Sequence, residues 1–297
     1  MKFSVWPNNQ RSWSDTLATA RRVEQLGFDG FWFADHLMPN RADGSPDPGD
    51  ALECWTVLAA VGALVPRVRL VSMVSPVTIH HPVVLAKRAA TVDQVSGGRA
   101  VLGLGAGWQV NEHAAYGFEL PEPGPRVARF EEAIRVIHSL LHASPSHFEG
   151  EHYRLADAPF SPAPVGPLPL LVGTGGPRML RITARWAQEW NTWGDPAEVR
   201  RRTDLFLAAC EAVDRDPGTM RRSAQAIVVL DGDESSPGYA AGRSIVGNAE
   251  QIAATLREYV AMGVDEFAFP DWNFGRTQSE RDEVVERLAT EVIPLVA

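Results

Sequence analysis

Short apolar runs alternate along the chain with longer segments whose apolar residues recur every three or four positions. The short runs predict β-strands, and the longer segments predict a helix after each strand. The predicted strands lie near residues 3–6, 30–34, 68–74, 100–105, 168–172, 190–193, 226–230 and 266–269. The predicted helices include segments that begin near Asp15, Ala51, Pro82 and Arg126, and segments near 198–213, 249–262 and 279–292.

The strand runs at 30–34 and 168–172 are almost wholly apolar, which is typical of parallel strands covered on both faces. Eight strands, each followed by a helix, within 297 residues predict an α/β fold with a single (β/α)8 TIM barrel. An open doubly wound sheet is the alternative. No low-complexity linker divides the chain, so we expect one domain over residues 1–297 with short insertions, among them a hairpin near 148–153.

The amino-acid composition excludes several kinds of binding partner and of protein class. The chain has 28 basic and 37 acidic residues, a net charge of −9 and no basic stripe, so nucleic acid is not an expected partner. Cys54 and Cys210 are the only cysteines, which excludes a disulfide scaffold and fits a reducing compartment. No apolar run reaches the roughly 18 residues of a membrane span, and the N-terminus lacks the apolar core of a signal peptide. We expect a cytoplasmic protein that acts on a small molecule.

In a barrel of this kind, functional residues lie at the C-terminal ends of the strands. Large aromatic side chains at these positions favour an apolar pocket for a flat ring system, although tryptophan can also simply close the mouth. The predicted pocket residues are Trp6, Trp108, Trp193 and Trp272.

Two small-residue runs follow predicted strands. One lies between a strand and a helix, where backbone N–H groups and the helix dipole favour a phosphate, and a tight turn without a ligand is the alternative. The other can admit the edge of a ligand or merely relieve crowding, and Asn111 after it can hydrogen-bond a polar edge. The runs are Gly173-Thr174-Gly175-Gly176 and Gly103-Leu104-Gly105-Ala106-Gly107.

Asp35 and His36 end the second predicted strand. An imidazole beside a carboxylate can transfer a proton near neutral pH, whereas a structural hydrogen bond is the alternative. His80, His81 and His113 do not give the ligand spacing of a zinc site, and there is no H-E-x-x-H motif, so no catalytic metal is expected.

Several of these motifs occur together in a known family. The sequence resembles the bacterial luciferase-like superfamily of flavin and deazaflavin oxidoreductases, which includes monooxygenases, and within it the branch that uses coenzyme F420. The resemblance extends from the first strand to the last helix. Its most specific segments are residues 68–76, 81–87, 96–99, 103–108, 111–112 and 172–176.

The resemblance implies that a flat ring binds in the barrel mouth, with its phosphate at the loop of residues 173–176. It implies a cis peptide bond between Ser72 and Met73, a hydrogen bond from Asp35 to the cofactor, and His36 as the proton donor. Asp35 and His36 are thus the predicted catalytic residues. The predicted cofactor-binding residues are Asp35, Ser72, Met73, Ser75, Gly105, Ala106, Gly107, Asn111, Gly173, Thr174, Gly175 and Gly176.

The resemblance favours F420 as the cofactor, with FMN as the alternative. The alternative functions are a luciferase-like monooxygenase that works with a separate flavin reductase, and a flavin-binding barrel without activity. Trp108 replaces an acidic residue of the family's sugar-phosphate dehydrogenases, and Lys2 and Lys87 are the only lysines. We therefore expect hydride transfer to or from a small hydrophobic substrate rather than glucose 6-phosphate. The family also implies a homodimer.

Overall fold

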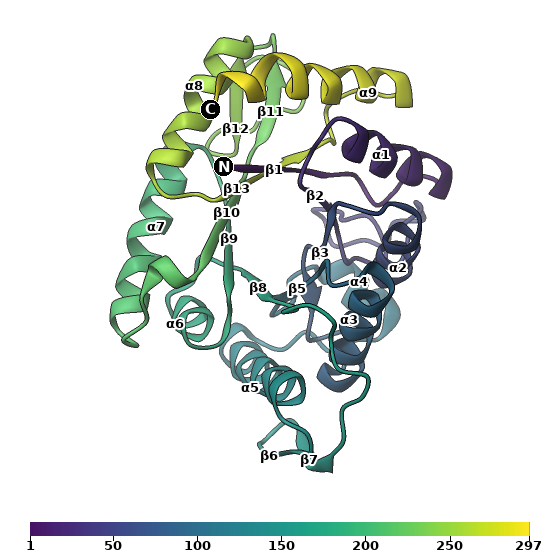
Figure 1. The fold of residues 1–297 in the computed structure, drawn as a ribbon, viewed down its shortest axis with the longest axis vertical. Helices are drawn as coiled ribbons and strands as arrows, with labels where there is room; N and C mark the ends of the chain where they lie inside the picture. Colours follow the sequence, from purple (N-terminus) through teal and green to yellow (C-terminus); the bar gives the residue numbers. More distant parts are fainter. Residues whose placement is uncertain (297) are drawn as a thin grey trace.

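A computed structural model describes residues 1–296 and shows a closed parallel β-barrel surrounded by helices (Figure 1). Its strands pair in the order β1, β2, β3, β5, β8, β9, β10 and β13, and β13 pairs again with β1. The short strand β4 (Ser75–Pro76) continues the course of β3 beside β5. The predicted barrel is therefore confirmed. The strand bounds are β1 Lys2–Trp6, β2 Gly30–Phe33, β3 Arg69–Ser72, β5 Ala100–Gly105, β8 Leu170–Gly173, β9 Glu189–Trp193, β10 Arg221–Gln225 and β13 Glu266–Pro270.

Helices cover the outside of the barrel, and side-chain caps define several of their starts. Glu53 accepts a hydrogen bond from the N–H of Thr56 at 2.7 Å, so α2 begins at Cys54 and not at residue 51. No described helix has the length and apolar composition to cross a bilayer. The helices are α1 Trp13–Gln25, α2 Cys54–Leu64, α3 Pro82–Ser96, α4 Val110–Tyr116, α5 Pro123–His142, α6 Pro177–Trp186, α7 Pro196–Glu211, α8 Ala249–Ala261 and α9 Gln278–Arg287, with 3₁₀ turns at Pro217–Thr219 and Ile293–Leu295 and a π turn at Leu288–Val292.

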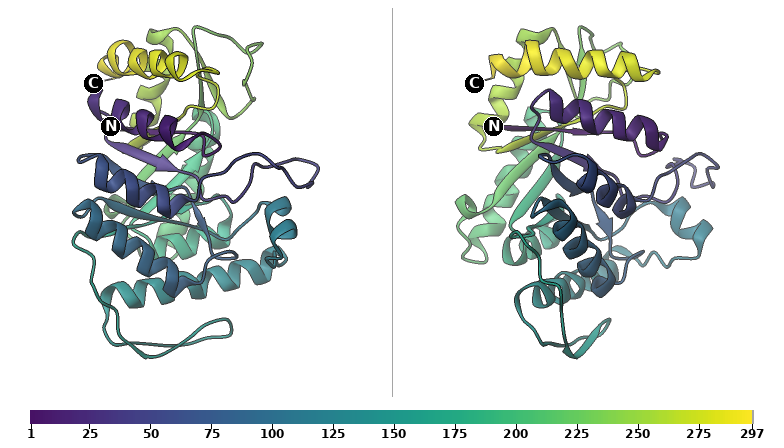
Figure 2. Two further views of the ribbon diagram at one scale, coloured as in Figure 1. Left: turned by 90° about the vertical axis from the view of Figure 1, so that its right-hand side faces the viewer. Right: turned by 45° about the vertical axis from the view of Figure 1, so that its right-hand side comes forward.

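Two insertions interrupt the repeating pattern. The predicted hairpin is present as the antiparallel pair β6 (Ser146–Glu149) and β7 (Arg154–Ala158). The loop between β2 and α2 projects together with α4 from one end of the barrel, while both chain termini lie toward the other end (Figure 2). These projecting segments belong to the end at which the barrel strands finish.

The seventh strand of the barrel is not the one that the sequence predicts. The apolar run 226–230 forms β11 (Ile227–Leu230), which pairs with β12 (Ser244–Gly247) in a separate two-stranded sheet. The barrel position belongs to β10, whose sequence Arg-Arg-Ser-Ala-Gln has no apolar run. The prediction is wrong because the polar side chains of β10 are satisfied inside the fold. Asn191 donates to Ser223 at 3.1 Å and to Gln225 at 2.6 Å.

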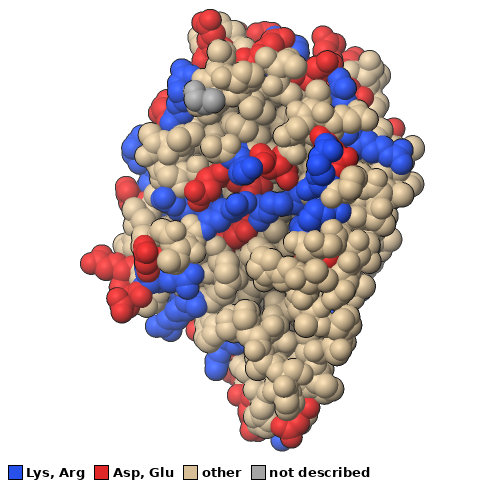
Figure 3. Space-filling model, in the orientation of Figure 1, with Lys and Arg blue, Asp and Glu red and all other residues tan. Residues whose placement is uncertain are grey.

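Charged side chains close the N-terminal end of the barrel. Glu266 is fully buried at the start of β13 and accepts hydrogen bonds from Trp32 at 3.0 Å, from Arg221 at 3.2 Å and from Arg69. Arg69 also pairs with Glu189, at 2.6 Å. Burial raises the pKa of Glu189, although the adjacent Arg69 guanidinium opposes the shift. In the orientation of Figure 1, a band of mixed basic and acidic side chains crosses the middle of the molecule (Figure 3).

Candidate functional site

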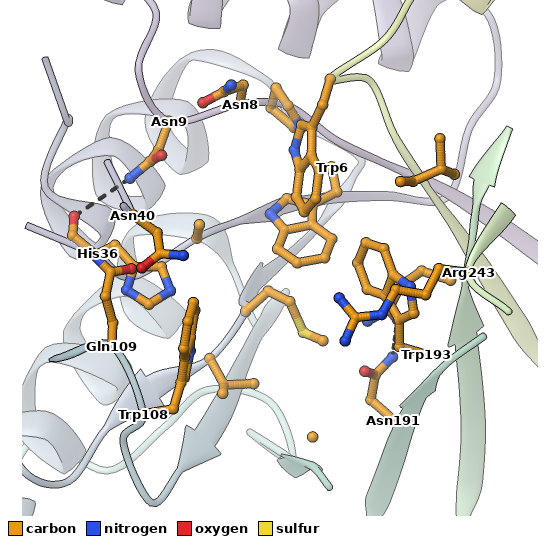
Figure 4. A pocket seen from close by; sticks show the side chains of 18 of the residues that line it. Trp6, Asn8, Asn9, His36, Asn40, Trp108, Gln109, Asn191, Trp193 and Arg243 are labelled. Carbon is orange, nitrogen blue, oxygen red and sulfur yellow. Dashed lines mark hydrogen bonds between the residues drawn. The ribbon is translucent and has the colours of Figure 1, made fainter. Parts of the chain in front are cut away.

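A cavity of about 650 Å³ opens at the end where the barrel strands finish (Figure 4). Its walls come from the ends of strands or the loops after them, at points as distant in the sequence as residues 6 and 272. This volume lies within the roughly 300–1,000 Å³ of small-molecule sites. The position agrees with the general rule for barrel enzymes.

Three of the predicted tryptophans form one wall of the cavity. Trp193 and Trp272 stack with their ring centroids 5.5 Å apart, and Trp6 meets Trp272 edge to face at 4.9 Å. The indole N–H groups of Trp6 and Trp193 are buried and have no hydrogen-bond partner in residues 1–296. Trp108 also lines the cavity, next to His36 and apart from Trp6 and Trp193 (Figure 4).

His36 lines the cavity, and its imidazole is hydrogen-bonded to the buried carboxylate of Glu112. Its Nδ1 lies 2.9 Å from Oε1 of Glu112, and the other Glu112 oxygen accepts the backbone N–H of Leu37 at 2.8 Å. Trp108 packs edge to face on the imidazole with the centroids 5.4 Å apart. Because a carboxylate only accepts, it fixes the proton on Nδ1 and leaves Nε2 toward the cavity. The sequence predicts no role for Glu112, although this residue lies in the family-like segment 111–112.

Asp35 points away from the cavity into a buried network. Its carboxylate accepts hydrogen bonds from the Ser75 hydroxyl and from His80, whose Nε2 lies 3.0 Å away. On the far side of His80, Arg88 lies 3.1 Å from Nδ1. Burial alone would raise the pKa of Asp35, but the hydrogen bonds and charge of His80 and the Ser75 hydroxyl hold it below its usual value. Asp35 therefore connects the end of β2 to β4 and α3.

The irregular segment between β3 and β4 forms the floor of the cavity. Met73 and Val74 line the cavity, and the peptide bond between them is cis. The expected cis bond between Ser72 and Met73 is wrong by one position, because the Met73 N–H still donates to Phe33 in the β2–β3 ladder, at 2.7 Å. Ser72 is buried, and its hydroxyl bonds both the N–H and the carbonyl oxygen of Gly103.

The small residues at the end of β5 and just after it pack behind this floor and do not line the cavity. A Cβ on Gly105 would lie 2.7 Å from Val74, and one on Gly107 would lie 2.2 Å from Thr78. Ala106 packs against the main apolar core. Asn111 donates to the carbonyl oxygens of Pro39 at 2.9 Å and Ser45 at 3.3 Å, so it fastens the long β2–α2 loop.

The glycine-rich run after β8 is divided between the cavity and the surface. Gly173 and Thr174 line the cavity, whereas Gly175 and Gly176 lie at its edge, before the first turn of α6. Arg202 of α7 also lines the cavity and lies close to this run, because a Cβ on Gly175 would be 3.2 Å from its Nη1. Backbone N–H groups, a helix N-terminus and a guanidinium form a suitable place for an anion. The sequence did not predict Arg202 as a site residue, because α6 and β9 separate it from the glycine-rich run in the chain.

The charged side chains that line the cavity are all basic. Arg202 and Arg243 line it, and no aspartate or glutamate within residues 1–296 does. The part of the chain that the structure describes contains no group of three or more His, Cys, Asp or Glu side chains placed to hold a metal ion. The site thus combines aromatic walls, one imidazole and positive charge, which suits a flat anionic ligand.

Comparison with known proteins gives the relatives of this chain. The model of the luciferase-like monooxygenase family matches residues 1–236. An F420-dependent glucose-6-phosphate dehydrogenase of Nakamurella multipartita is 35% identical over 203 residues, which is 68% of this chain and 58% of that protein. An F420-dependent hydroxymycolic acid dehydrogenase of Mycobacterium tuberculosis is 29% identical over 74% of this chain and 60% of that protein. The chain therefore spans little more than half of the length of these curated relatives.

Solved structures share the fold over the whole chain. An F420-dependent secondary alcohol dehydrogenase in complex with an F420–acetone adduct superposes with a TM-score of 0.83 and 20% identity, covering 100% of this chain and 99% of the other. A monooxygenase from Streptomyces bottropensis superposes with a TM-score of 0.81 and 21% identity, covering 100% of both chains. At these identities the likeness establishes the barrel and its connectivity.

Proposed function

The chain belongs to the luciferase-like monooxygenase family, and on that premise we propose that it is an oxidoreductase that transfers a hydride between coenzyme F420 and a small organic substrate. The observation that carries this proposal is the Glu112-supported imidazole of His36 at the wall of a deep aromatic cavity. The F420-dependent dehydrogenases among its relatives support the choice of cofactor.

The residues present fit a flat, anionic cofactor. The cavity lining has no acidic side chain to repel such a ligand, and the buried indole N–H groups of Trp6 and Trp193 have no partner within the described chain. We assign the ring of the cofactor to the floor at Met73 and Val74, and its phosphate to Gly173 and Thr174. Arg202, beside this glycine-rich run, supplies a positive charge for the tail.

When bound, F420 would supply or accept the hydride, while the protein provides position and electrostatics. His36 is the residue that we assign to proton transfer, through Nε2, at the substrate atom that gains or loses a proton. Glu112 holds the imidazole in the tautomer and orientation that this role requires, so it is a positioning residue. The tryptophan wall excludes water from the reacting atoms and packs against the apolar part of the substrate.

The other predicted cofactor residues act from behind the cavity surface in this proposal. The hydrogen bond between Asp35 and Ser75 fixes the backbone next to His36. Ser72 bonds to Gly103, and Asn111 bonds to the β2–α2 loop. Gly105, Ala106 and Gly107 leave room for the floor, and Gly175 and Gly176 lead into α6. A homodimer, a cytoplasmic location and a predominantly hydrophobic substrate stay predictions.

Titration of the purified protein with F420 and, separately, with FMN tests the cofactor. Quenching of tryptophan fluorescence reports binding, because three tryptophans form one wall of the cavity. We expect F420 to bind at least about tenfold more tightly than FMN, which corresponds to roughly 1.4 kcal/mol. Equal binding would remove the basis for F420, and tighter FMN binding with oxygen-dependent turnover would instead support a monooxygenase.

Substitution His36→Ala tests the catalytic assignment. We expect turnover of reduced F420 with a panel of ketones, aldehydes and enones to fall by about 10²–10⁴-fold, because a general acid or base contributes that much. F420 affinity should stay within about tenfold, since the ring packs mainly on other residues. Exposed His147, which has no side-chain contact to the cavity, provides the matched control His147→Ala. If wild-type protein transfers no hydride from reduced F420 to any panel member, a flavin-binding barrel without activity is favoured.

A further inference from the structure

The cavity carries positive charge in a protein of opposite net charge. The whole chain has a formal charge of −9, yet the described part of its cavity lining contains two arginines and no carboxylate. Glu112, the carboxylate behind His36, is buried and already accepts two hydrogen bonds. A concave site with low-dielectric walls focuses such a potential on whatever enters it. The lining therefore favours a ligand with negative charge.

The two arginines differ in whether their guanidinium groups already pair with an acidic side chain of the protein. Arg202 donates to Oε1 of Glu198 at 2.6 Å, and hydrogen bonds from Arg201 and Arg202 lower the pKa of Glu198 to about 2, so this carboxylate is ionised at neutral pH. Arg243 has no ion pair and no side-chain hydrogen bond with any residue in 1–296. Its guanidinium is the cavity cation whose five N–H donors remain available to a ligand.

The backbone of Arg243 is held in place although its side chain is exposed. Its N–H donates to the carbonyl oxygen of Ala240 at 3.0 Å, and its own carbonyl oxygen accepts the N–H of Ile227 at 2.8 Å. The preceding Gly242 accepts the N–H of Asp195 at 3.1 Å, which fastens the loop before β12 to the end of β9. The side chain extends into the cavity beside Trp193 and Asn191, on the side opposite His36 and Trp108 (Figure 4).

We propose that Arg243 binds a carboxylate of the substrate. This inference rests on the proposed function and names the substrate class of the same site. The planar fork of a guanidinium matches a carboxylate with two parallel hydrogen bonds. The single positive charge of Arg243 matches a monoanion, whereas a phosphate dianion would leave one negative charge unpaired by this guanidinium. The apolar body of the substrate packs on the tryptophan wall, and its reacting carbon faces His36 across the cavity.

A pair of isosteric probes tests this assignment. The protein is first saturated with F420, and the fluorescence of the cofactor reports that step by itself. Calorimetric titrations with 3-phenylpropanoate and with 3-phenylpropanamide then compare a carboxylate with its neutral amide. We expect wild-type protein to bind the carboxylate about tenfold or more tightly than the amide, as charge-assisted hydrogen bonds allow. Arg243→Gln should reduce this preference to about twofold, and Arg243→Lys should keep part of it, because it retains the charge but not the fork.

Arg181→Gln is the matched control, because Arg181 is exposed on α6 and does not line the cavity. It should leave the carboxylate preference unchanged. The proposal is overturned if wild-type protein does not bind the carboxylate, if it binds the amide as tightly, or if Arg243→Gln keeps the tenfold preference. It is also overturned if Arg243→Gln instead weakens F420 about tenfold, because Arg243 would then serve the tail of the cofactor. Failure of F420 to bind contradicts the proposed function alone, and the same probe titrations without cofactor still test Arg243.

Discussion

The carboxylate of Glu112 accepts two hydrogen bonds, one from Nδ1 of His36 and one from the N–H of Leu37. Both carboxylate oxygens are thereby used, and the side chain is fully buried. Trp108 also packs edge to face against the imidazole and limits its rotation. At the scale of single residues, the orientation of His36 thus depends on a partner that touches no ligand.

Glu112→Gln is expected to lower kcat by about 10- to 100-fold, by analogy with the carboxylates that orient metal-bound histidines. An amide cannot accept from both His36 and Leu37 at the same two positions, so the ring loses its fixed tautomer. KM should change by less than about threefold, because the aromatic contacts with the substrate remain. Steady-state kinetics give this division, and ¹⁵N NMR of His36 should show the proton no longer confined to Nδ1.

Exposed Glu119 offers the control Glu119→Gln, with the same chemical change outside the cavity. Equal losses in kcat and in the free energy of unfolding, with an unchanged His36 tautomer, would mean that Glu112 is only a structural residue.

Sequence reasoning found the residue types of the site better than their orientations. It identified His36 and the four tryptophans, since residues at strand ends face the mouth of a barrel. It could not tell that Asp35 points away from the cavity, because adjacent positions at a strand end face different sides. Nor could it tell that Asn111, in α4, bonds to the β2–α2 loop instead of facing the cavity. Glu112 follows His36 by 76 positions, and only the folded chain brings them together.

At the scale of elements, the main-chain hydrogen-bond ladder between β3 and β5 is interrupted where the cavity floor is built. Leu70 and Val71 pair with β5 before the irregular segment, and Ser75 pairs with it afterwards. Between these points the Ser72 hydroxyl replaces the main-chain ladder by bonding Gly103. The strands are close enough here that an added Cβ on Gly103 would lie 1.8 Å from the Ser72 carbonyl oxygen.

Gly103→Ala is expected to lower the free energy of unfolding by about 1–3 kcal/mol, because overpacking of a buried site costs that amount. The atom that it meets belongs to the backbone and cannot rotate away. The control is Gly124→Ala, at a position where an added Cβ meets nothing within 4 Å, in the first turn of α5. Urea denaturation of both variants measures the difference. A Gly103→Ala protein as stable as Gly124→Ala would contradict the close approach of β3 and β5.

The elements themselves were predictable wherever their apolar pattern is strong. The exception is the seventh barrel strand. The sequence of β10 is polar and does not predict a strand, whereas the apolar sequence of β11 predicts a core strand. Periodicity reports the burial of apolar side chains, so it misses a strand whose buried side chains are polar and bonded to one another. The hydrogen bonds from Asn191 to Ser223 and Gln225 exist only after β9 and β10 pair.

At the scale of the whole molecule, one buried glutamate joins strands from both halves of the chain. Glu266 of β13 contacts Ser4 of β1, Trp32 of β2 and Arg69 of β3, so it stabilises the closure of the barrel. Its charge is compensated by Arg69 and Arg221. A buried carboxylate without such partners carries a large desolvation cost.

Arg69→Met should therefore reduce the free energy of unfolding by about 3 kcal/mol or more, because it leaves Glu266 and Glu189 without their shared cation. Lys2→Met removes a cation from the exposed pair with Asp29 and is expected to cost only about 0–1 kcal/mol. Equilibrium urea denaturation at neutral pH compares the two variants. Similar costs would show that the buried network contributes no more than a surface ion pair.

The chain by itself determined the alternation of strands and helices, and with it the barrel and the end that carries the site, because burial of apolar surface is encoded locally as a periodic pattern. It also determined the family, through motifs that are contiguous in sequence. Four features became visible only in the folded protein: which carboxylate supports His36, where the cis bond lies in the floor, which polar segment completes the barrel, and that Arg243 faces the cavity with no partner among residues 1–296. These features depend on contacts between residues far apart in the chain, whose distances and orientations exist only once the barrel has closed.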